Sequence, residues 1–357
     1  MGLSTPLSER IGIEHPFMQA GMGGIGPITL APLAAAISQA GALGTLAQPA
    51  LVLEEGANVD HDQIERQIEV VVQQVREGIR RAVSLTDKPL AVNVRIAQEQ
   101  PDAPHVVRAI LDERERDPKV RAQLKVLTTS GGHPRMFGLN GDVRDSGMLH
   151  FHSVSNVRHA LNAQREGMDA IIATGFEAAG HVGHSPVHTF VLVPSIVAAV
   201  DLPVICSGGV VDGVALAGAL ALGAQLGYVG SRFLAAEECE YHQANKDFIV
   251  AADETQTDVV ACFFGPARFI QNGFTDEVRR LEAAGTPRLE RMAIEGAALR
   301  RGALEGDMTD GMMIGGQGIG RVRSVLPAAE IVAQIAADAE AALDRAAAFR
   351  ARASTTT

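Results

Sequence analysis

The sequence predicts an α/β protein folded as a (β/α)8 TIM barrel with a helical lid inserted after the eighth strand. Short apolar or β-branched runs alternate with longer segments of helical period, which is the pattern of a parallel sheet covered by helices. Eight such runs occur within about the first 250 residues, the size of one barrel. After the eighth run the rhythm changes to charged helical segments. An open doubly wound sheet is the main alternative, because it is built from the same strand–helix units.

The strand candidates are short and are separated by segments long enough for a helix. They cover residues 17–20, 42–47, 90–96, 125–130, 148–154, 170–175, 203–209 and 226–233. Helical patterns between them include residues 62–84, 156–167 and 212–223. Several of these helical patterns end at a glycine, the residue preferred in the left-handed position that closes a helix.

The predicted domain organisation follows from this rhythm. Residues 1–252 and 321–350 form the barrel, with a closing helix over 327–350. Residues 253–320 form a helical lid or substrate subdomain over the barrel mouth, and residues 351–357 form a disordered tail.

Composition excludes several classes of partner. The chain of 357 residues carries a formal charge of -11 and has no long basic run, which argues against nucleic acid and anionic membranes as partners. No apolar stretch reaches the roughly 20 residues of a membrane helix. Three cysteines without metal-type spacing fit a reducing cytoplasm and give no metal site. We expect a cytoplasmic enzyme acting on a small molecule; composition does not choose between a monomer and a homodimer.

Gly21, Gly23 and Gly26 have the G-x-G-x-x-G spacing of a dinucleotide-binding turn. In such a turn the helix contains the third glycine, and an acidic residue follows about 20 residues later at the end of the next strand. Here Pro27 follows Gly26 at once, and the nearest acidic residues lie beyond the next predicted strand. These departures argue against a dinucleotide fold.

The ends of the last two strands carry glycines where barrels commonly bind phosphate. Strand seven ends in Ser207, Gly208 and Gly209, and strand eight ends in Val229, Gly230 and Ser231. Glycine lets a ligand oxygen approach backbone N–H groups that a Cβ would block. We expect a phosphate site here; the alternative is that these glycines only turn the chain.

The loop after the sixth strand, ATGFEAAGHVGHSP, is the most distinctive stretch of the chain. It places polar residues among small ones at a strand end, which suits a flat, bulky ligand above the barrel. His181 in this loop has the chemistry of a general base near neutral pH. The alternative is a loop histidine that caps backbone groups.

Six motifs together resemble the nitronate monooxygenase family, formerly called 2-nitropropane dioxygenases, over about residues 10–335. They are QAGMGGI at 19–25, VNVRI at 92–96, EAAGHVG at 177–183, PVICSGGVVDG at 203–213, ALGAQLGYVGSRFL at 221–234 and GGQGIG at 315–320. The superfamily also contains flavin-dependent enoyl-thioester reductases and NAD(P)H:quinone reductases. The resemblance therefore implies a TIM barrel that holds FMN noncovalently, and it is less specific for the reaction.

The resemblance also implies roles for individual residues. Ala20, Gly21 and Met22 would lie along the isoalloxazine ring, Asn93 would hydrogen-bond the flavin, and Gln317 would lie near the ring. The phosphate contacts would be Gly209, Tyr228, Val229, Gly230 and Ser231; Gly180, Ser207 and Gly208 complete the expected cofactor site. His181 would be the base that members acting on neutral nitroalkanes use.

Two departures from the family pattern Q-G-x-E-A-G-G-H fall in this expected cofactor site. Thr174 replaces the glutamine and is shorter, and Ala179 replaces the first glycine with one added methyl group. His133, in SGGHP at the end of strand four, is a candidate second base or substrate anchor, with a local turn role as the alternative. Apolar walls are expected from Met22, Met312, Met313, Phe176 and Phe264, each of which could instead be core.

Three functions remain open at this point. The leading one is FMN-dependent oxidation of an alkyl nitronate, or a nitroalkane, by O2 to a carbonyl compound and nitrite. In the second, NAD(P)H reduces the flavin, which passes a hydride to a quinone or an enoyl thioester. The third is a phosphate-binding barrel without redox chemistry, because fold alone does not determine function.

Overall fold

The computed structural model describes residues 2–51, 61–97, 100–135 and 138–354. Its centre is a sheet of eight parallel strands: β1 (Phe17–Gln19), β2 (Gly44–Ala47), β3 (Leu90–Arg95), β4 (Leu124–Ser130), β5 (Leu149–Val154), β6 (Ala170–Thr174), β8 (Val204–Ser207) and β9 (Leu226–Val229). The order in the sheet is β1-β9-β8-β6-β5-β4-β3-β2. A parallel bridge between Met18 and Leu43 brings the first strand to the second, and the Gln19 N–H donates to the Leu43 carbonyl at 2.8 Å.

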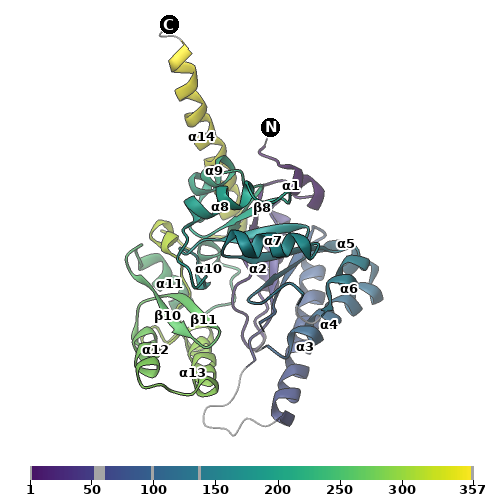
Figure 1. Cartoon of the computed structure of the whole chain (residues 1–357), viewed down its shortest axis with the longest axis vertical. Coiled ribbons are helices and arrows are strands. Elements are labelled where there is room, and N and C mark those ends of the chain that lie inside the picture. The colour runs from purple at the N-terminus through teal and green to yellow at the C-terminus, as the bar shows by residue number, and fades with distance from the viewer. Residues whose placement is uncertain (1, 52–60, 98–99, 136–137, 355–357) are drawn as a thin grey trace.

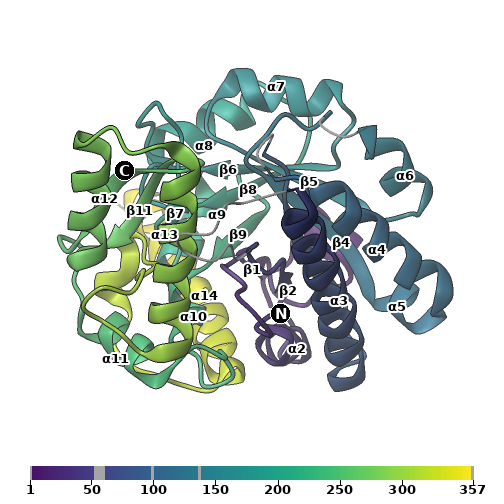
Figure 2. The same ribbon diagram turned by 90° about the horizontal axis from the view of Figure 1, so that it is seen from below.

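This closure confirms the predicted TIM barrel and rules out an open doubly wound sheet. Helices cover the outside: α2 (Ala31–Gln39), α3 (His61–Leu85), α4 (Ala103–Arg116), α5 (Pro118–Gln123), α6 (Asn140–Asp145), α7 (Val157–Arg165), α8 (Thr189–Val197), α9 (Gly213–Ala221) and α14 (Ala328–Ser354). Figure 2 shows the strands gathered in the centre with these helices around them. The last helix packs between α9 and α2, where the eighth helix of a barrel belongs.

The interior of the barrel is apolar at the end where the strands begin. The barrel strands, with Leu43 just before β2, contribute to a buried apolar cluster that includes Met18, Leu43, Ala91, Val126, Phe151, Ala170, Ile172, Ile205 and Leu226. Leu7 and Ile11 of the short helix α1 (Pro6–Ile11) close the cluster from below. Because successive side chains of a strand alternate, the next inward residues lie two positions later, toward the strand ends.

The N-terminal helix is fixed to the barrel by its cap. Thr5 and Ser8 form a reciprocal capping box. The Thr5 hydroxyl also donates to the Gln225 carbonyl at 2.8 Å, and the Leu7 N–H donates to the Gln225 side chain at 3.0 Å. These bonds hold α1 against the start of β9, so the barrel opens only at its other end.

The segment after β9 differs from the prediction in two ways. The predicted strand at 226–233 ends at Val229, and residues 231–234 form the helical turn α10 (Ser231–Leu234), followed by α11 (Gln243–Ala251). The expected helical lid also contains an antiparallel hairpin, β10 (Thr257–Cys262) and β11 (Gly265–Ile270), before the helices α12 (Gly273–Ala283) and α13 (Arg288–Arg300). Figure 1 shows these elements together beside the barrel.

The hairpin is not isolated, because β11 also pairs with the two-residue strand β7 (Gly180–His181) from the loop after β6. Two further short elements follow in the insertion, a π-helix at Arg301–Glu305 and a 3-10 helix at Gln317–Arg321. The insertion therefore binds to the barrel through a shared three-stranded sheet. Whether it acts as a lid stays a prediction.

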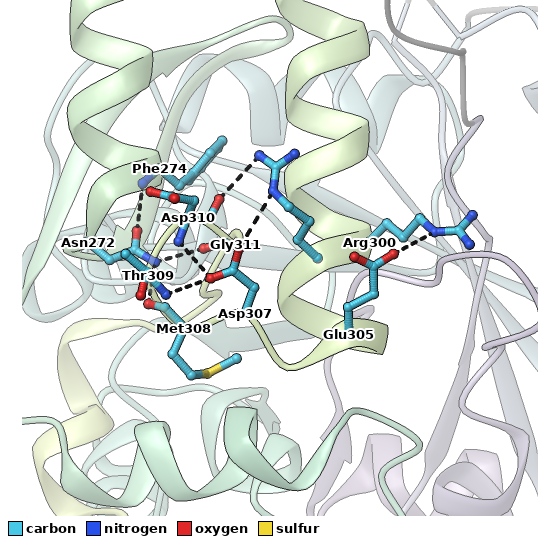
Figure 3. Close-up of polar contacts among 10 residues, drawn as sticks. Asn272, Phe274, Arg300, Glu305, Asp307, Met308, Thr309, Asp310 and Gly311 are labelled. Atoms are coloured by element: carbon cyan, nitrogen blue, oxygen red, sulfur yellow. Dashed lines mark hydrogen bonds and ion pairs between the residues drawn. The ribbon is translucent and has the colours of Figure 1, made fainter.

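Side-chain caps hold the return from the insertion in place, as Figure 3 shows. Asn272 caps α12 by accepting from the Phe274 N–H and also donates to the carbonyls of Met308 and Gly311 at 3.0 and 2.8 Å. The Asp307 carboxylate accepts from the backbone N–H groups of Thr309 and Asp310. Residues 307–311, which lead to the GGQGIG motif, are therefore held in place by these hydrogen bonds.

The C-terminus also departs from the prediction. The closing helix α14 continues to Ser354, so residues 351–354 are helical and not part of a disordered tail, while 355–357 lie outside the described residues. In Figure 1 this helix reaches beyond the barrel. Among the helices of the described ranges, none is both long and apolar enough to cross a membrane.

Candidate active site

A cavity of about 1220 Å³ lies where the barrel strands end and the insertion begins. Its wall contains residues that end or follow β1, β3, β4, β5, β6, β8 and β9, together with the insertion residues Phe263, Met292 and Ile314. This is the end of a TIM barrel at which active sites form. The size is that of a cofactor and substrate site.

The floor of the cavity is a layer of hydrogen-bonded polar side chains. Asn93 donates from its side-chain amide to the Thr128 hydroxyl at 2.9 Å, and Thr128 is in turn hydrogen-bonded to Tyr228. The Tyr228 hydroxyl also accepts from the Gly21 N–H at 2.8 Å, and burial raises its pKa. Polar atoms from four strand ends thus meet above the apolar interior.

This network gives a structural reason for Gly21. A Cβ on Gly21 would lie 2.2 Å from the Asn93 side chain, so the glycine is required by the asparagine beside it. Whether Gly21 lies along a flavin ring stays a prediction. The G-x-G-x-x-G stretch also lacks the geometry of a dinucleotide turn, because α2 begins only at Ala31.

Two glycines in the wall do leave open space in the cavity. Gly209 has a φ of 75° and Gly180 a φ of 66°, both left-handed, and a Cβ at either position would meet nothing within 4 Å. Both residues line the cavity. A side chain here would occupy the cavity and strain the backbone. The structure therefore contains a cradle of the kind that a ligand fills.

The sixth strand contributes Thr174, whose hydroxyl lies 2.7 Å from that of Ser153 on β5. Both side chains line the cavity. The hydroxyl that replaces the family glutamine is thus already partnered by a second hydroxyl.

His181 is held at the edge of the cavity by backbone pairing. It lies on β7 opposite Ala267 of β11, and the following Val182 N–H donates to the Pro266 carbonyl at 2.9 Å. Its ring stands edge-on to Phe264, with the ring centres 5.7 Å apart. The insertion therefore sets the position of the histidine.

The imidazole of His181 is uncharged at neutral pH. It is accessible from the cavity, yet it lies deep enough in the protein that burial, with the Arg95 charge as a smaller cause, lowers its pKa to about 4. A neutral imidazole can accept a proton from a substrate. His181 thus has both the access and the protonation state of a general base.

Arg268 fixes the loop that leads to His181. Its guanidinium donates to the Phe176 carbonyl from Nε and Nη2 at 3.2 and 3.0 Å, and to the Thr257 hydroxyl at 3.0 Å. The same guanidinium lies 5.4 Å from the centre of the Phe176 ring. Phe176 is therefore bound to the insertion by both its backbone and its ring.

The GGQGIG turn closes against the same loop. The Gly316 N–H donates to the Ser231 hydroxyl at 3.0 Å, and the Gln317 N–H donates to the Glu177 carbonyl at 3.0 Å. A Cβ on Gly316 would lie 2.8 Å from the Glu177 carbonyl oxygen. The turn can approach this closely only because it has glycine there.

His133 has a local contact and a place on the cavity wall. Its Nδ1 accepts from the Arg135 N–H at 3.1 Å, which is the turn role considered as the alternative. The residue is exposed and also lines the cavity. A role in catalysis stays a prediction.

Nearly all of the predicted site residues come together around this one cavity. They are Ala20, Gly21, Met22, Asn93, His133, Thr174, Ala179, Gly180, His181, Ser207, Gly208, Gly209, Tyr228, Gly230 and Ser231. Val229 and Gln317 are not in the wall: the first is fully buried in its strand, and the second begins the 3-10 helix. The flavin contacts assigned to these residues stay predictions.

The expected apolar wall is partly wrong. Met22, Met312 and Phe264 line the cavity, whereas Met313 is fully buried in the core and Phe176 packs under Arg268. Sequence reasoning also gave no role to Arg95 and Arg268. The sequence did contain a signal that Arg95 lines the site: it follows Asn93 by two residues in a strand, so both side chains lie on the same face.

The formal charges of the cavity wall balance, whereas the chain as a whole is acidic. Its wall contains Arg95 and Arg158, with five histidines, against Glu177 and Glu295 as the acidic residues. The chain as a whole has a formal charge of -11. Within the described ranges, no group of three His, Cys, Asp or Glu could hold a metal ion. Arg95 and Arg158 are the cationic groups that this wall offers to an anionic ligand.

Comparison with known proteins agrees with this geometry. The family model described as nitronate monooxygenase matches residues 4–338. The chain is 33% identical to a (3aS,4S,5R,7aS)-5-hydroxy-7a-methyl-1-oxo-octahydro-1H-indene-4-carboxyl-CoA dehydrogenase of Rhodococcus jostii (strain RHA1), over 80% of this chain and 70% of that protein. It is 30% identical to a nitronate monooxygenase of Paraburkholderia phytofirmans, covering 92% and 93% of the two chains. The structure of a nitroalkane oxidase from Streptomyces ansochromogenes is similar with a TM-score of 0.73 at 25% identity, covering 96% of this chain and 99% of that one.

Proposed function

Since the chain belongs to the nitronate monooxygenase family of flavin-dependent oxidoreductases, we propose that it binds FMN and oxidises alkyl nitronates, and nitroalkanes, with O2. The products are a carbonyl compound and nitrite. Two nitronate anions and one O2 give two carbonyl compounds and two nitrite ions, so atoms and charge balance.

One observation carries the proposal: an accessible, uncharged imidazole stands on the wall of a cavity with the shape of a cofactor site. His181 has a pKa of about 4 because of burial, so it is a free base at neutral pH. A neutral nitroalkane must lose its α proton before it can be oxidised as a nitronate. A base of this kind is the group that such a substrate needs.

The residues present fit FMN. The open left-handed glycine Gly209 and its neighbour Gly208, with Gly230 and Ser231 on the adjacent strand end, suit the phosphate. The backbone of Ala20–Met22 with Asn93 suits the flat ring. When bound, the flavin supplies the electron transfer between nitronate and O2.

The chain's own residues supply position and proton transfer. The α C–H bond of a nitroalkane breaks, its proton goes to the His181 imidazole, and the electron pair moves to the nitro oxygens. Phe264 and Met312 on the wall exclude water from the reacting carbon. A preformed nitronate needs the same binding site but no base, because it has already lost the α proton.

Anaerobic mixing tests the proposal. The flavin-loaded protein is mixed with an alkyl nitronate, with NADH or with NADPH, and the flavin absorbance is followed. We expect reduction of the flavin by the nitronate, and nitrite on admission of O2. Rapid bleaching by a pyridine nucleotide together with inertness toward nitronates would contradict the proposal.

A second candidate is supported by the relative named as a carboxyl-CoA dehydrogenase, which is 33% identical to this chain. In this alternative a pyridine nucleotide exchanges electrons with the flavin, and the flavin exchanges a hydride with a CoA thioester or a quinone. The size of the cavity is compatible with such a substrate. The pyridine nucleotide arm of the mixing experiment distinguishes the two candidates.

We further propose that the protein acts in a reducing cytoplasm, on small molecules alone. Cys206, Cys239 and Cys262 are unpaired and buried. Burial raises the pKa of the Cys206 thiol to about 12 and that of Cys239 to about 11. Thiols in this state are poor nucleophiles, and the cysteines are packing residues in this proposal.

A further inference from the structure

Arg95 stands on the cavity wall without a function in the mechanism above. It is the last residue of β3 and follows Asn93 by two positions, so both side chains leave the same face of the strand. Both residues line the cavity. Arg95 is therefore the cation that the barrel itself places above its polar floor.

The guanidinium of Arg95 is only partly satisfied by protein acceptors. Nε donates to the Gln100 side chain at 3.3 Å, Nη1 to the Gln48 carbonyl at 3.3 Å and Nη2 to the Pro49 carbonyl at 3.2 Å. All three acceptors are neutral, and the bonds are long for N–H···O. A guanidinium has five N–H groups, so two remain without an acceptor among the described residues.

Within the part of the chain that the structure describes, no acidic side chain is in direct contact with Arg95. Asp102 interacts with it electrostatically, but the Asp102 carboxylate accepts instead from the Gln48 side-chain amide. No ion pair of Arg95 occurs among the described residues. Burial lowers the pKa of Arg95, yet arginine stays protonated in proteins. A buried charge without a direct partner is costly, and such a charge beside a cavity points to an anionic ligand.

The other charges of the cavity leave this site to a ligand. Glu177 is engaged by the backbone N–H and hydroxyl of Thr189, and Glu295 accepts from the Phe263 N–H at 2.7 Å. The Arg95 charge also contributes to the low pKa of His181. Arg95 and His181 therefore act on the same region of the cavity.

We propose that Arg95 binds the two oxygens of the substrate's nitro group and holds the nitronate anion beside His181. This inference rests on the proposed function and names the specificity-determining residue of that site. A guanidinium pairs with a planar two-oxygen anion through two parallel N–H···O bonds. When His181 takes the α proton, the electron pair of the broken C–H bond moves onto these oxygens, where the Arg95 charge stabilises it.

Nitrate tests this site without turnover, because it is a planar oxyanion that the enzyme cannot oxidise. The flavin-loaded protein is titrated with sodium nitrate at constant ionic strength, and the change in flavin absorbance gives a dissociation constant. We expect saturable binding that Arg95→Gln weakens about tenfold or more. Arg279→Gln is the control, because it removes an exposed arginine of α12 that does not line the cavity, and it should leave nitrate binding unchanged.

Arg95→Lys covers the case in which the glutamine variant does not fold. It keeps the charge and loses the two-pronged geometry, so nitrate should bind several-fold more weakly while flavin is retained. The KM for an alkyl nitronate should rise in parallel. Unchanged nitrate binding and unchanged KM in either folded variant would overturn the inference, and so would an equal loss in Arg279→Gln.

The two proposals fail separately. If nitrate binding depends on Arg95 but nitronates are not oxidised, the anion site stands and the proposed function is wrong. If nitronates are oxidised with an unchanged KM in Arg95→Lys, the function stands and the role of Arg95 is wrong.

Discussion

His181 is the residue on which the proposed chemistry depends most. The ring is accessible, is carried by a strand paired with the insertion, and is neutral at physiological pH because burial lowers its pKa to about 4. Each property has a separate structural cause. A mutation of His181 can therefore test the proton transfer without disrupting the cofactor-binding site.

The variant His181→Asn should lose activity on neutral nitroalkanes and keep activity on preformed nitronates, which have already lost the α proton. We expect kcat/KM for a nitroalkane to fall by about 10²–10⁴ and that for its nitronate to change by only a few-fold. Steady-state oxygen consumption with both forms of one substrate measures the ratio. An equal loss on both forms would mean that the histidine positions substrate and does not abstract a proton.

Gly209 offers a test of the phosphate site with an internal control. Gly209 and Gly147 both have a φ of 75°, and a Cβ at either would meet nothing within 4 Å, but only Gly209 lines the cavity. Alanine at either position should cost about 1–2 kcal/mol of stability from the left-handed backbone. FMN affinity should fall about tenfold or more in Gly209→Ala alone. If a flavin titration gives the same FMN dissociation constant for both variants, the phosphate does not bind at this loop.

Single residues show where sequence reasoning reaches its limit. The place of glycines and polar residues at strand ends was predictable, because the C-terminal ends of barrel strands line the active-site cavity. The reason for Gly21 was not, since only the packed structure brings the Asn93 side chain to 2.2 Å from its missing Cβ. Phe176 was misassigned for the same reason, because its partner Arg268 is 92 residues away.

At the scale of elements, the β10–β11 hairpin connects the insertion to catalysis. Its second strand pairs with Gly180 and His181, and Arg268 on that strand holds the Phe176 carbonyl. The insertion is thus a support for the histidine in addition to a wall of the cavity. Sequence reasoning predicted only helices here, because Pro266 lies within the second strand and argues against a strand pattern.

Arg268→Met should expose this support role. The variant leaves the Phe176 carbonyl without its donor, which costs about 1–3 kcal/mol and lowers Tm. The loosened loop should also reduce kcat/KM for a neutral nitroalkane about tenfold or more, and that for the nitronate less, because only the former needs an aligned base. Arg279→Met, which removes an exposed arginine from α12, is the control and should do neither. An equal loss of kcat/KM on both substrates would mean that Arg268 has only a structural role.

At the scale of the whole molecule, the strand–helix alternation with its eight strand candidates favoured the barrel over an open sheet. Every strand candidate overlaps an observed strand, and the Met18–Leu43 bridge closes the ring. The neighbouring strands β4 and β5 contain a less expected feature. Thr129 links His150 and His152, with its hydroxyl 2.8 Å from Nε2 of the first and 2.9 Å from Nδ1 of the second.

These buried histidines make the fold sensitive to acid. Burial lowers the pKa of His150 to about 4 and that of His152 to about 3, from 6.5. Between pH 6.5 and about 4 the unfolded chain therefore binds more protons than the folded one, so the free energy of unfolding falls as pH falls through this window. In His150→Gln the loss between pH 7 and 5 should be smaller by on the order of 1–2 kcal/mol.

Urea denaturation at the two pH values measures this difference. His105→Gln replaces an exposed histidine of α4 and serves as the control. If the wild-type free energy of unfolding were as large at pH 5 as at pH 7, the buried histidines would not be neutral in the fold.

The central claim is that the ends of the barrel strands form one flavin seat, with His181 at its open face. A crystal structure of the flavin-loaded protein tests this most directly. We predict the FMN phosphate beside Gly209 and Gly230, the ring along Gly21 and Met22, and the His181 imidazole facing the ring. A phosphate bound elsewhere, or an imidazole turned away from the ring, would contradict the account.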